Sequence, residues 1–250
     1  MIKMLRENLL KRKVYNFFYV HLLFVSGLLL LDITATGLTI SLLCHVLILS
    51  PLSSLIIHLK FNHSYIQFKN SILEWLGLCL VCVYSFWKFT DIKSYHVHHH
   101  QSWKTLHDPT ASEIAQGKIK YYLGLTDPCT IPKFDATHNP KINFINQNFY
   151  LTKISIYLIV ILLFGITAFF YSIIAQQFYF YVLNKIHDIM FHSTVDAVDK
   201  PWLFPIYFND SWHVRHHANY LNLDSWQWPW INVHYWYYKL FFTQDKNESH

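Results

Sequence analysis

Long apolar runs alternate with polar segments along this chain, and the runs have the length of membrane helices. A helix that crosses the hydrocarbon core of a bilayer needs about 20 predominantly apolar residues. Three such runs are Val14–Leu31, Leu38–Ile57 and Leu151–Ile174, and Phe178–Met190 is a shorter run of the same kind. The pattern predicts four transmembrane helices, over about residues 14-31, 38-57, 151-174 and 178-190.

Short polar segments join these runs in pairs. Asp32–Gly37 separates the first two runs, and Gln176-Gln177 separates the last two. Each pair is therefore expected to form a hairpin whose two ends return to the same side of the membrane. Five basic residues precede the first run and place that side in the cytoplasm by the positive-inside rule: Lys3, Arg6, Lys11, Arg12 and Lys13.

The composition supports this class of protein. Hydrophobic residues make up 53% of the 250 residues and charged residues only 14%, which is too apolar for an ordinary soluble domain. We expect a multi-pass integral membrane protein of a bacterial inner membrane or of the endoplasmic reticulum. The formal net charge of +5 is spread along polar segments, so no nucleic-acid partner is expected. Cys79 and Cys82 lie within an apolar run and indicate ordinary buried residues.

Seventeen histidines are present, and nine of them fall into three short clusters. The clusters are His58 with His63, then His96-Val-His98-His99-His100, then His213-Val-Arg-His216-His217. Helix positions i, i+3 and i+4 share one face. His96, His99 and His100 therefore converge, as do His213, His216 and His217, while His98 points elsewhere. His58 and His63 lie about 140° apart on an α-helix, so they bind one metal only if the helix ends between them, or else reach two metals.

Eight converging imidazoles exceed what a single iron or zinc ion uses, so the clusters predict a dinuclear metal centre. The clusters contain no cysteine, and structural zinc takes only four ligands. Iron used for oxygen activation is the better match. We interpret the isolated histidines His21, His45, His138, His234 and His250 as ordinary core or surface residues, and leave the role of His107 open.

A further apolar stretch, Ile72–Phe89, contains Glu74 and Lys88 and either spans the membrane or lies in the interface. If it spanned, the first two clusters would lie on opposite sides, so an interfacial helix that returns to the cytoplasm is favoured. The aromatic tail Trp226–Phe242 is also expected at the interface. The predicted fold is all-α integral membrane: four transmembrane helices in two hairpins plus an interfacial helix. Residues 58-150 and 191-250 form a cytosolic His-rich cap on a single domain spanning 1-250.

The order and spacing of the clusters, H-x-x-x-x-H, H-x-x-H-H and H-x-x-H-H, resemble those of the membrane-bound fatty acid desaturase family. The acyl-CoA Δ9 (stearoyl-CoA type) branch and its bacterial relatives are the most similar. Asp108-Pro109 follows His99-His100 after seven residues, as in that branch. Asn-Asp-Ser-Trp-His213-Val-Arg-His216-His217 is similar to its Gly-Glu-Gly-Trp/Phe-His-Asn-x-His-His block, and Trp230-Ile231-Asn232 has a counterpart there. The resemblance covers residues 14 to 242.

The resemblance implies two iron ions held by nine histidines, with an asparagine that contacts one iron through water. Eight of the nine are His58, His63, His96, His99, His100, His213, His216 and His217. In the family the ninth follows the asparagine by four residues, but here Asn184 is followed at that distance by Asp188. Either His187 is the ninth ligand, or the pair shifts to Asp188 and His192. Asn184 and Asp188 are the candidates for the water-mediated contact.

The resemblance further implies a reaction: O2-dependent removal of two hydrogens from neighbouring carbons of a long-chain acyl substrate, giving a cis double bond. The substrate would be an acyl-CoA, an acyl-carrier or a lipid-linked chain. Because the sequence has no flavin or haem motif, electrons are expected from an external donor such as cytochrome b5 or ferredoxin. The alternative is a di-iron acyl, sterol or carotenoid hydroxylase or ketolase. A metal transporter is disfavoured, because its ligands would lie within the spans.

Overall fold

The structure, a computed structural model, describes the backbone of residues 2–64, 66–103, 105, 107–129, 131, 139–192, 198–218 and 228–244, and their side chains except at 2–11, 209, 210 and 218. The chain divides into two compact units. The first comprises Met1–Leu42, Ser94–Phe134 and Ile159–Ala197, and the second Leu43–Lys93, Asp135–Leu158 and Val198–His250. Three helices continue from one unit into the other: α2 (Ala35–Cys44), α5 (Phe89–Gln101) and α9 (Phe149–Phe169).

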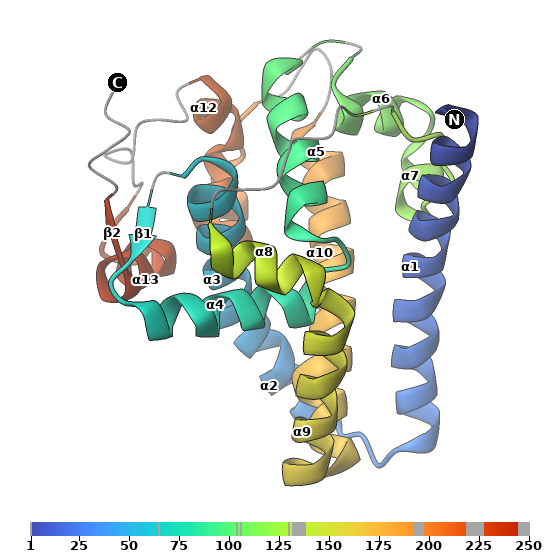
Figure 1. Ribbon diagram of the computed structural model, residues 1–250, viewed down its shortest axis with the longest axis vertical. Coiled ribbons are helices and arrows are strands. Elements are labelled where there is room, and N and C mark those ends of the chain that lie inside the picture. The colour runs from blue at the N-terminus through green and yellow to red at the C-terminus, as the bar shows by residue number, and fades with distance from the viewer. Residues whose placement is uncertain are drawn as a thin grey trace. The chain divides into compact units, whose positions relative to one another are not determined.

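The first unit is built around the long N-terminal helix. It holds α1 (Ile2–Leu30), α6 (Pro109–Ala115), α7 (Lys118–Tyr122), the π-helical segment η3 (Phe170–Ile174) and α10 (Ala175–Phe191). Helix α1 packs against η3 and α10 (Figure 1). Phe24 stacks on Phe178 with ring centroids 4.0 Å apart. Apolar stacking along α1 thus fixes the helix whose end carries His192.

The second unit is formed by shorter elements. Its helices are η1 (His45–Leu49), α3 (Ser50–Ser54), η2 (Leu55–Asn62), α4 (Ser71–Tyr84), α8 (Pro140–Gln147), η4 (Pro201–Leu203), α11 (Phe204–Tyr207), η5 (Phe208–Trp212), α12 (His213–Ala218) and α13 (Val233–Phe241). Its main core joins η2, α4 and α8 through Leu55, Leu78 and Ile145, each at most 1% exposed. This core holds η2, which carries His58, in place.

A two-stranded antiparallel ribbon in the second unit departs from the all-α prediction. Strand β1 (Ile66–Phe68) pairs with β2 (Phe242–Gln244), and Phe68 lies opposite Phe242 with ring centroids 4.5 Å apart. A three-residue strand is too short to show a period-2 pattern in the sequence. The ribbon ties the segment after His63 to the C-terminal end of the described chain.

Three helical stretches are long and apolar enough to cross a membrane: Arg12–Leu30, Ala35–Asn62 and Phe149–Phe191. The first two contain most of the first two predicted spans, Val14–Leu31 and Leu38–Ile57, and agree with a membrane protein. The turn between them ends sooner than expected, because the Thr34 hydroxyl accepts the Gly37 N–H at 3.0 Å and caps α2.

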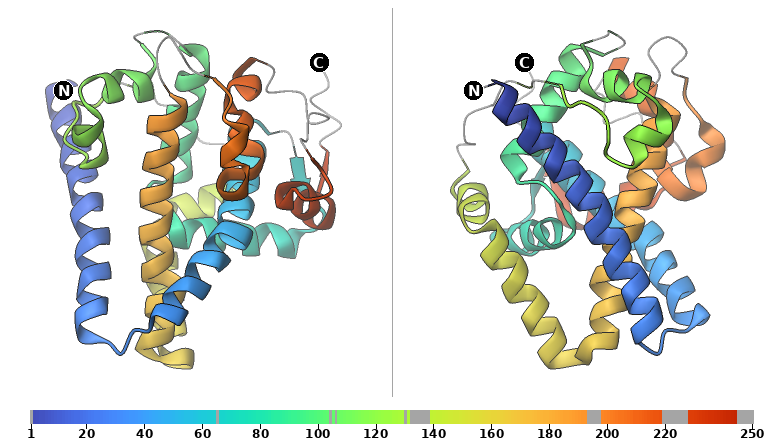
Figure 2. Two further views of the ribbon diagram at one scale, coloured as in Figure 1. Left: turned by 180° about the vertical axis from the view of Figure 1, so that it is seen from behind. Right: turned by 90° about the vertical axis from the view of Figure 1, so that its right-hand side faces the viewer.

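The predicted turn at Gln176-Gln177 is wrong, and so are the adjoining boundaries of the last two spans. Both glutamines lie within α10 and are buried, at 3% and 1% exposure. Gln176 donates to the Ser41 hydroxyl at 2.7 Å, so its polar side chain clamps two helices together. The helical path breaks instead at Gly165, whose φ of 81° only glycine adopts readily. After this break the chain reverses direction and continues through η3 into α10 (Figure 2).

The apolar stretch predicted as Ile72–Phe89 is helical only as far as Tyr84. Helix α4 ends there, and α5 leaves it at an angle of 82°. The break follows from local hydrogen bonds: Ser85 is extended and its hydroxyl bonds the Trp87 backbone, while Asn146 accepts the Phe89 N–H at 2.9 Å. The stretch therefore forms no straight span, and α5 presents the second histidine cluster.

Substituting Gly27 with alanine is expected to destabilise the first unit. An added Cβ would lie 2.1 Å from Phe170 Cε2, and the Phe170 ring is 2% exposed, so it has little room to move. Overpacking of this kind costs about 1–3 kcal/mol. Thermal unfolding of the detergent-solubilised protein should show the loss, while Ser26→Ala on the same helix should not. Equal stability of Gly27→Ala and the parent would contradict this packing.

Candidate metal centre

Three histidines of the second unit surround one point. His58 lies in η2 and His63 directly follows it. The His63 N–H donates to the His58 carbonyl oxygen at 3.1 Å, five residues back, which is a π-helical turn. That turn brings the two rings to a centroid distance of 5.1 Å. The α-helical separation of about 140° assumed from the sequence therefore does not apply, and both residues could bind one metal ion.

His216 completes this group. Its Nε2 lies 2.7 Å from His58 Nε2, and its ring centroid is 5.1 Å from that of His63. The three ligand nitrogens all lie within 4.8 Å of one another. The first histidine cluster thus meets a residue of the third cluster, which is distant in the sequence, at the end of an apolar helix. The metal hypothesis requires such a meeting.

The rest of the third cluster forms a pair on α12. His213 and His217 are four residues apart, and their Nε2 atoms are 3.0 Å apart. Asp199 holds the start of this helix: its Oδ1 accepts the backbone N–H of Val214 at 3.0 Å and of Arg215 at 3.3 Å. Because Asp199 is distant in sequence, it was not identified as a cap before the structure.

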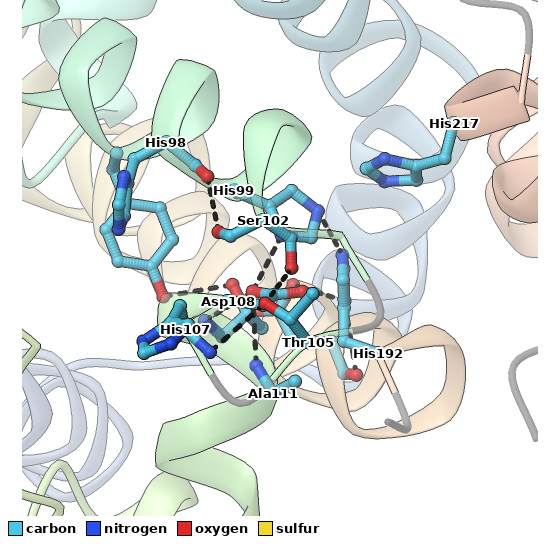
Figure 3. A network of polar contacts seen from close by, with 12 residues as sticks. His98, His99, Ser102, Thr105, His107, Asp108, Ala111, His192 and His217 are labelled. Atoms are coloured by element: carbon cyan, nitrogen blue, oxygen red, sulfur yellow. Dashed lines mark hydrogen bonds and ion pairs between the residues drawn. The ribbon is translucent and has the colours of Figure 1, made fainter. Parts of the chain in front are cut away.

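In the first unit the second cluster is presented by α5. His96 and His100 face each other with ring centroids 4.4 Å apart. His99 turns instead towards the end of α10, where its Nε2 lies 3.1 Å from His192 Nε2. Figure 3 shows the two rings facing each other, and the two residues are 4% and 5% exposed. The ring of Trp103 packs edge-on against both, with centroids 5.3 and 5.7 Å away, and helps to exclude water.

The end of α10 carries the residues between which the sequence left a choice. His187, Asp188 and His192 offer ligand atoms within 4.8 Å of one another. His192 is the one that contacts His99, whereas His187 Nδ1 lies 3.8 Å from Asp188 Oδ1. Asp188 Oδ2 accepts the Tyr121 hydroxyl. Asn184, one turn earlier, is exposed and lies outside this group.

The nitrogen separations fit shared metal ions. Two imidazole nitrogens bound at about 2.1 Å to one ion lie about 3.0 Å apart at a right angle and about 3.4 Å apart in a tetrahedron. The Nε2–Nε2 distances of 3.0 Å for His213–His217 and 3.1 Å for His99–His192 match the right-angle separation, and the 2.7 Å for His58–His216 is shorter than either value. A nitrogen-only donor set of this kind suits iron, zinc, copper or nickel.

Burial keeps two of these imidazoles neutral, which is the form that binds metal. Burial, with a smaller contribution from Lys93, lowers the pKa of His63 to about 4. Burial and the neighbouring His99 also lower the pKa of His192 well below its usual value. Both rings are therefore in the neutral form that can bind a metal ion at neutral pH.

The stability of the metal-free protein is expected to fall as the pH drops from about 6.5 to 4. In that window the unfolded chain protonates His63 while the folded protein does not, so protons favour unfolding. A pKa lowered from 6.5 to about 4 corresponds to about 3 kcal/mol. Denaturant unfolding of the chelator-treated protein at several pH values measures this effect. His63→Gln, which cannot titrate, should lose less stability across the same window, and an identical pH slope would contradict the assignment.

The remaining described histidines lie outside these groups. His98, as expected, joins none of them. His21 hydrogen-bonds the Phe17 carbonyl and the Tyr122 hydroxyl, which confirms an ordinary structural residue. His107 is exposed, and His45 and His234 are buried. His138 and His250 lie outside the described residues.

From the sequence, Asp108 was expected only as part of the Asp108-Pro109 motif. Its carboxylate Oδ1 lies 2.8 Å from His99 Nδ1 and also accepts the Thr110 and Ala111 N–H groups at 2.9 and 3.3 Å (Figure 3). Asp followed by Pro is a helix-start signal, and it would have located α6. Only the structure shows that the same oxygen reaches a histidine.

Comparison with protein-family models, curated proteins and solved structures finds no match to this chain.

Proposed function

We propose that this protein is a membrane di-iron fatty acyl desaturase, which inserts a cis double bond into a long-chain acyl substrate with O2 and external electrons. One observation carries the proposal: the histidine clusters form three Nε2–Nε2 pairs at 2.7 to 3.1 Å, the spacing of ligands that share a metal. The cluster spacing in the sequence supplies the resemblance to desaturases.

The donor set supports two irons rather than one. The first unit contributes four of the histidines, His96, His99, His100 and His192, and the second contributes His58, His63, His213, His216 and His217. Together they are the nine that the resemblance implies, with His192 as the ninth. His187 and Asp188 would then act on His192 rather than bind iron themselves.

In the membrane, the proposal uses two hairpins with their ends on the cytoplasmic side. The break at Gly165 divides Phe149–Phe191 into two arms and gives the second hairpin its turn. Helices α1 and Ala35–Asn62 form the first hairpin, and the bent pair α4–α5 stays in the interface. The basic residues at Arg12 and Lys13 favour a cytoplasmic location for the start of α1.

When bound, the iron pair supplies the oxidising power needed to break an unactivated C–H bond. The chain's own residues bind and orient. His99 and His192 are held in a nearly water-free site by Trp103. Asp108 contacts the imidazole of His99 on α5 and orients it. Asp199 accepts a backbone N–H at the start of α12 and holds that helix end in place. A separate donor such as cytochrome b5 or ferredoxin supplies the electrons.

The test is fatty-acid profiling by gas chromatography–mass spectrometry of cells that express the protein together with a competent electron donor. His216→Ala, which removes one member of the imidazole pair with Nε2 atoms 2.7 Å apart, is the control. A new unsaturated acyl chain, absent from the control, is the expected result and locates the double bond. Hydroxylated acyl chains, or oxidised sterols or carotenoids, would replace the desaturase proposal with the hydroxylase or ketolase alternative. An unchanged lipid profile from iron-loaded protein would overturn the proposal.

A further inference from the structure

We propose that Asp108 is a positioning residue that fixes His99 as a metal ligand. The inference rests on the metal-binding part of the proposed function and is independent of the acyl substrate. Asp108 is 0% exposed and lies on the short connection between α5 and α6, next to the helix it caps. The connection brings its carboxylate back to a histidine nine residues earlier.

The geometry of the contact sets the tautomer of His99. An ionised carboxylate only accepts hydrogen bonds, so the 2.8 Å contact places the proton of the neutral ring on Nδ1. The Nε2 atom then carries a lone pair that can bind a metal ion, and it is Nε2 that faces His192 at 3.1 Å (Figure 3). Metal-bound imidazoles commonly donate their other N–H to a carboxylate, which fixes the ring and strengthens its donor nitrogen.

The carboxylate is itself held firmly. The same oxygen, Oδ1, accepts the backbone N–H groups of Thr110 and Ala111, which have no partner within the first turn of α6. Pro109 fills the first helical position, where a missing N–H costs nothing. The position of His99 is thus tied to the start of a helix rather than to a flexible side chain.

The second carboxylate oxygen, Oδ2, indicates that a positive charge belongs near this site. Asp108 Oδ2 is buried and has no hydrogen-bond partner among the described residues. A buried carboxylate with one unsatisfied oxygen is costly unless a nearby positive charge offsets it. A metal ion on His99 is such a charge, on the far side of the ring that Asp108 contacts.

Two substitutions separate the functions of Asp108. Asp108→Ser keeps a good helix cap but is too short to reach His99. Asp108→Asn keeps an acceptor of the same size and removes the charge. The measurement is the dissociation constant of Co²⁺ for the full-length, detergent-purified protein, by chelator competition, together with the absorption spectrum of the bound Co²⁺. Asp108→Ser should weaken the affected site about 10–100-fold and alter its spectrum, and Asp108→Asn should have a smaller effect in the same direction.

Asn139 provides the matched control. It caps α8 through Lys141 and Ile142 N–H groups at 2.9 and 3.3 Å, is likewise followed by proline, and donates to Glu74 rather than contacting an imidazole. Asn139→Ser should leave Co²⁺ affinity unchanged. Wild-type affinity in both Asp108 variants, or an equal loss in Asn139→Ser, would overturn the inference. The Co²⁺ binding assay contains no acyl substrate. Its outcome therefore does not depend on whether fatty-acid profiling detects lipid oxidation.

Discussion

Replacing either His58 or His216 with alanine is expected to abolish lipid oxidation and to remove iron from the protein. Their Nε2 atoms lie 2.7 Å apart, and His63 completes the group. Loss of a residue that merely supports a ligand costs about 10–100-fold in metal affinity or activity, so loss of a ligand should cost at least about 100-fold. The measurements are the iron content of the purified protein and the yield of oxidised lipid.

The double variant makes this prediction sharper. Residues that act on one metal ion are strongly non-additive, so His58→Ala with His216→Ala should be no worse than either change alone. His98→Ala is the matched control, because His98 lies within a histidine cluster but outside the ligand groups. Independent, additive effects at His58 and His216, or an equal loss in His98→Ala, would contradict a shared ion.

Replacing His192 with alanine is expected to have a much larger effect than replacing His187. His192 is 5% exposed and contacts His99 through Nε2, while its Nδ1 lies 3.3 Å from the Asp188 carbonyl oxygen. That carbonyl is positioned to accept a proton on Nδ1, which leaves Nε2 free for the metal. His187 instead packs its ring on Phe191, with centroids 4.6 Å apart. His192→Ala should lose at least about 100-fold in activity, and His187→Ala less than about tenfold.

Metal content distinguishes the two roles independently of activity. His192→Ala should retain less iron than the parent, whereas His187→Ala should retain the parent's stoichiometry. His21→Ala is a suitable control on another helix of the same unit, since His21 hydrogen-bonds the Phe17 carbonyl oxygen and the Tyr122 hydroxyl. A larger iron loss in His187→Ala than in His192→Ala would make His187 the ninth ligand.

Much of the candidate site was accessible from spacing alone. The i, i+3, i+4 pattern predicted that His213, His216 and His217 would converge on one point; the nitrogens of His213 and His217 do lie 3.0 Å apart, but His216 joins His58 and His63 instead. The predicted convergence of all three residues is therefore wrong, as it is for His96, His99 and His100, because His99 turns to His192. The same pattern separated His98 from its neighbours. It predicted less about His58 and His63, because the sequence does not reveal that η2 is π-helical, and a π-turn changes which residues share a face.

Polar residues within apolar runs caused the clearest error. Gln176 and Gln177 were predicted to form a turn because the sequence does not show which side chains pack beside them. Ser41 accepts hydrogen bonds from Gln176, so this polar residue can lie within a buried helix. Gly165 marks the actual break in the helical path. One glycine in an apolar run does not by itself predict a break, because its φ is not known from the sequence.

The sequence by itself determined that the chain has membrane-length apolar helices and histidine clusters with metal-ligand spacing. Both depend on periodicity and composition, which are local properties of the chain. Only the tertiary structure decided that His192 rather than His187 meets His99, and that Asp108 and Asp199 hold the imidazoles' surroundings in place. These contacts join residues far apart in sequence or separated by a turn, and their partners are set by how the helices end and pack.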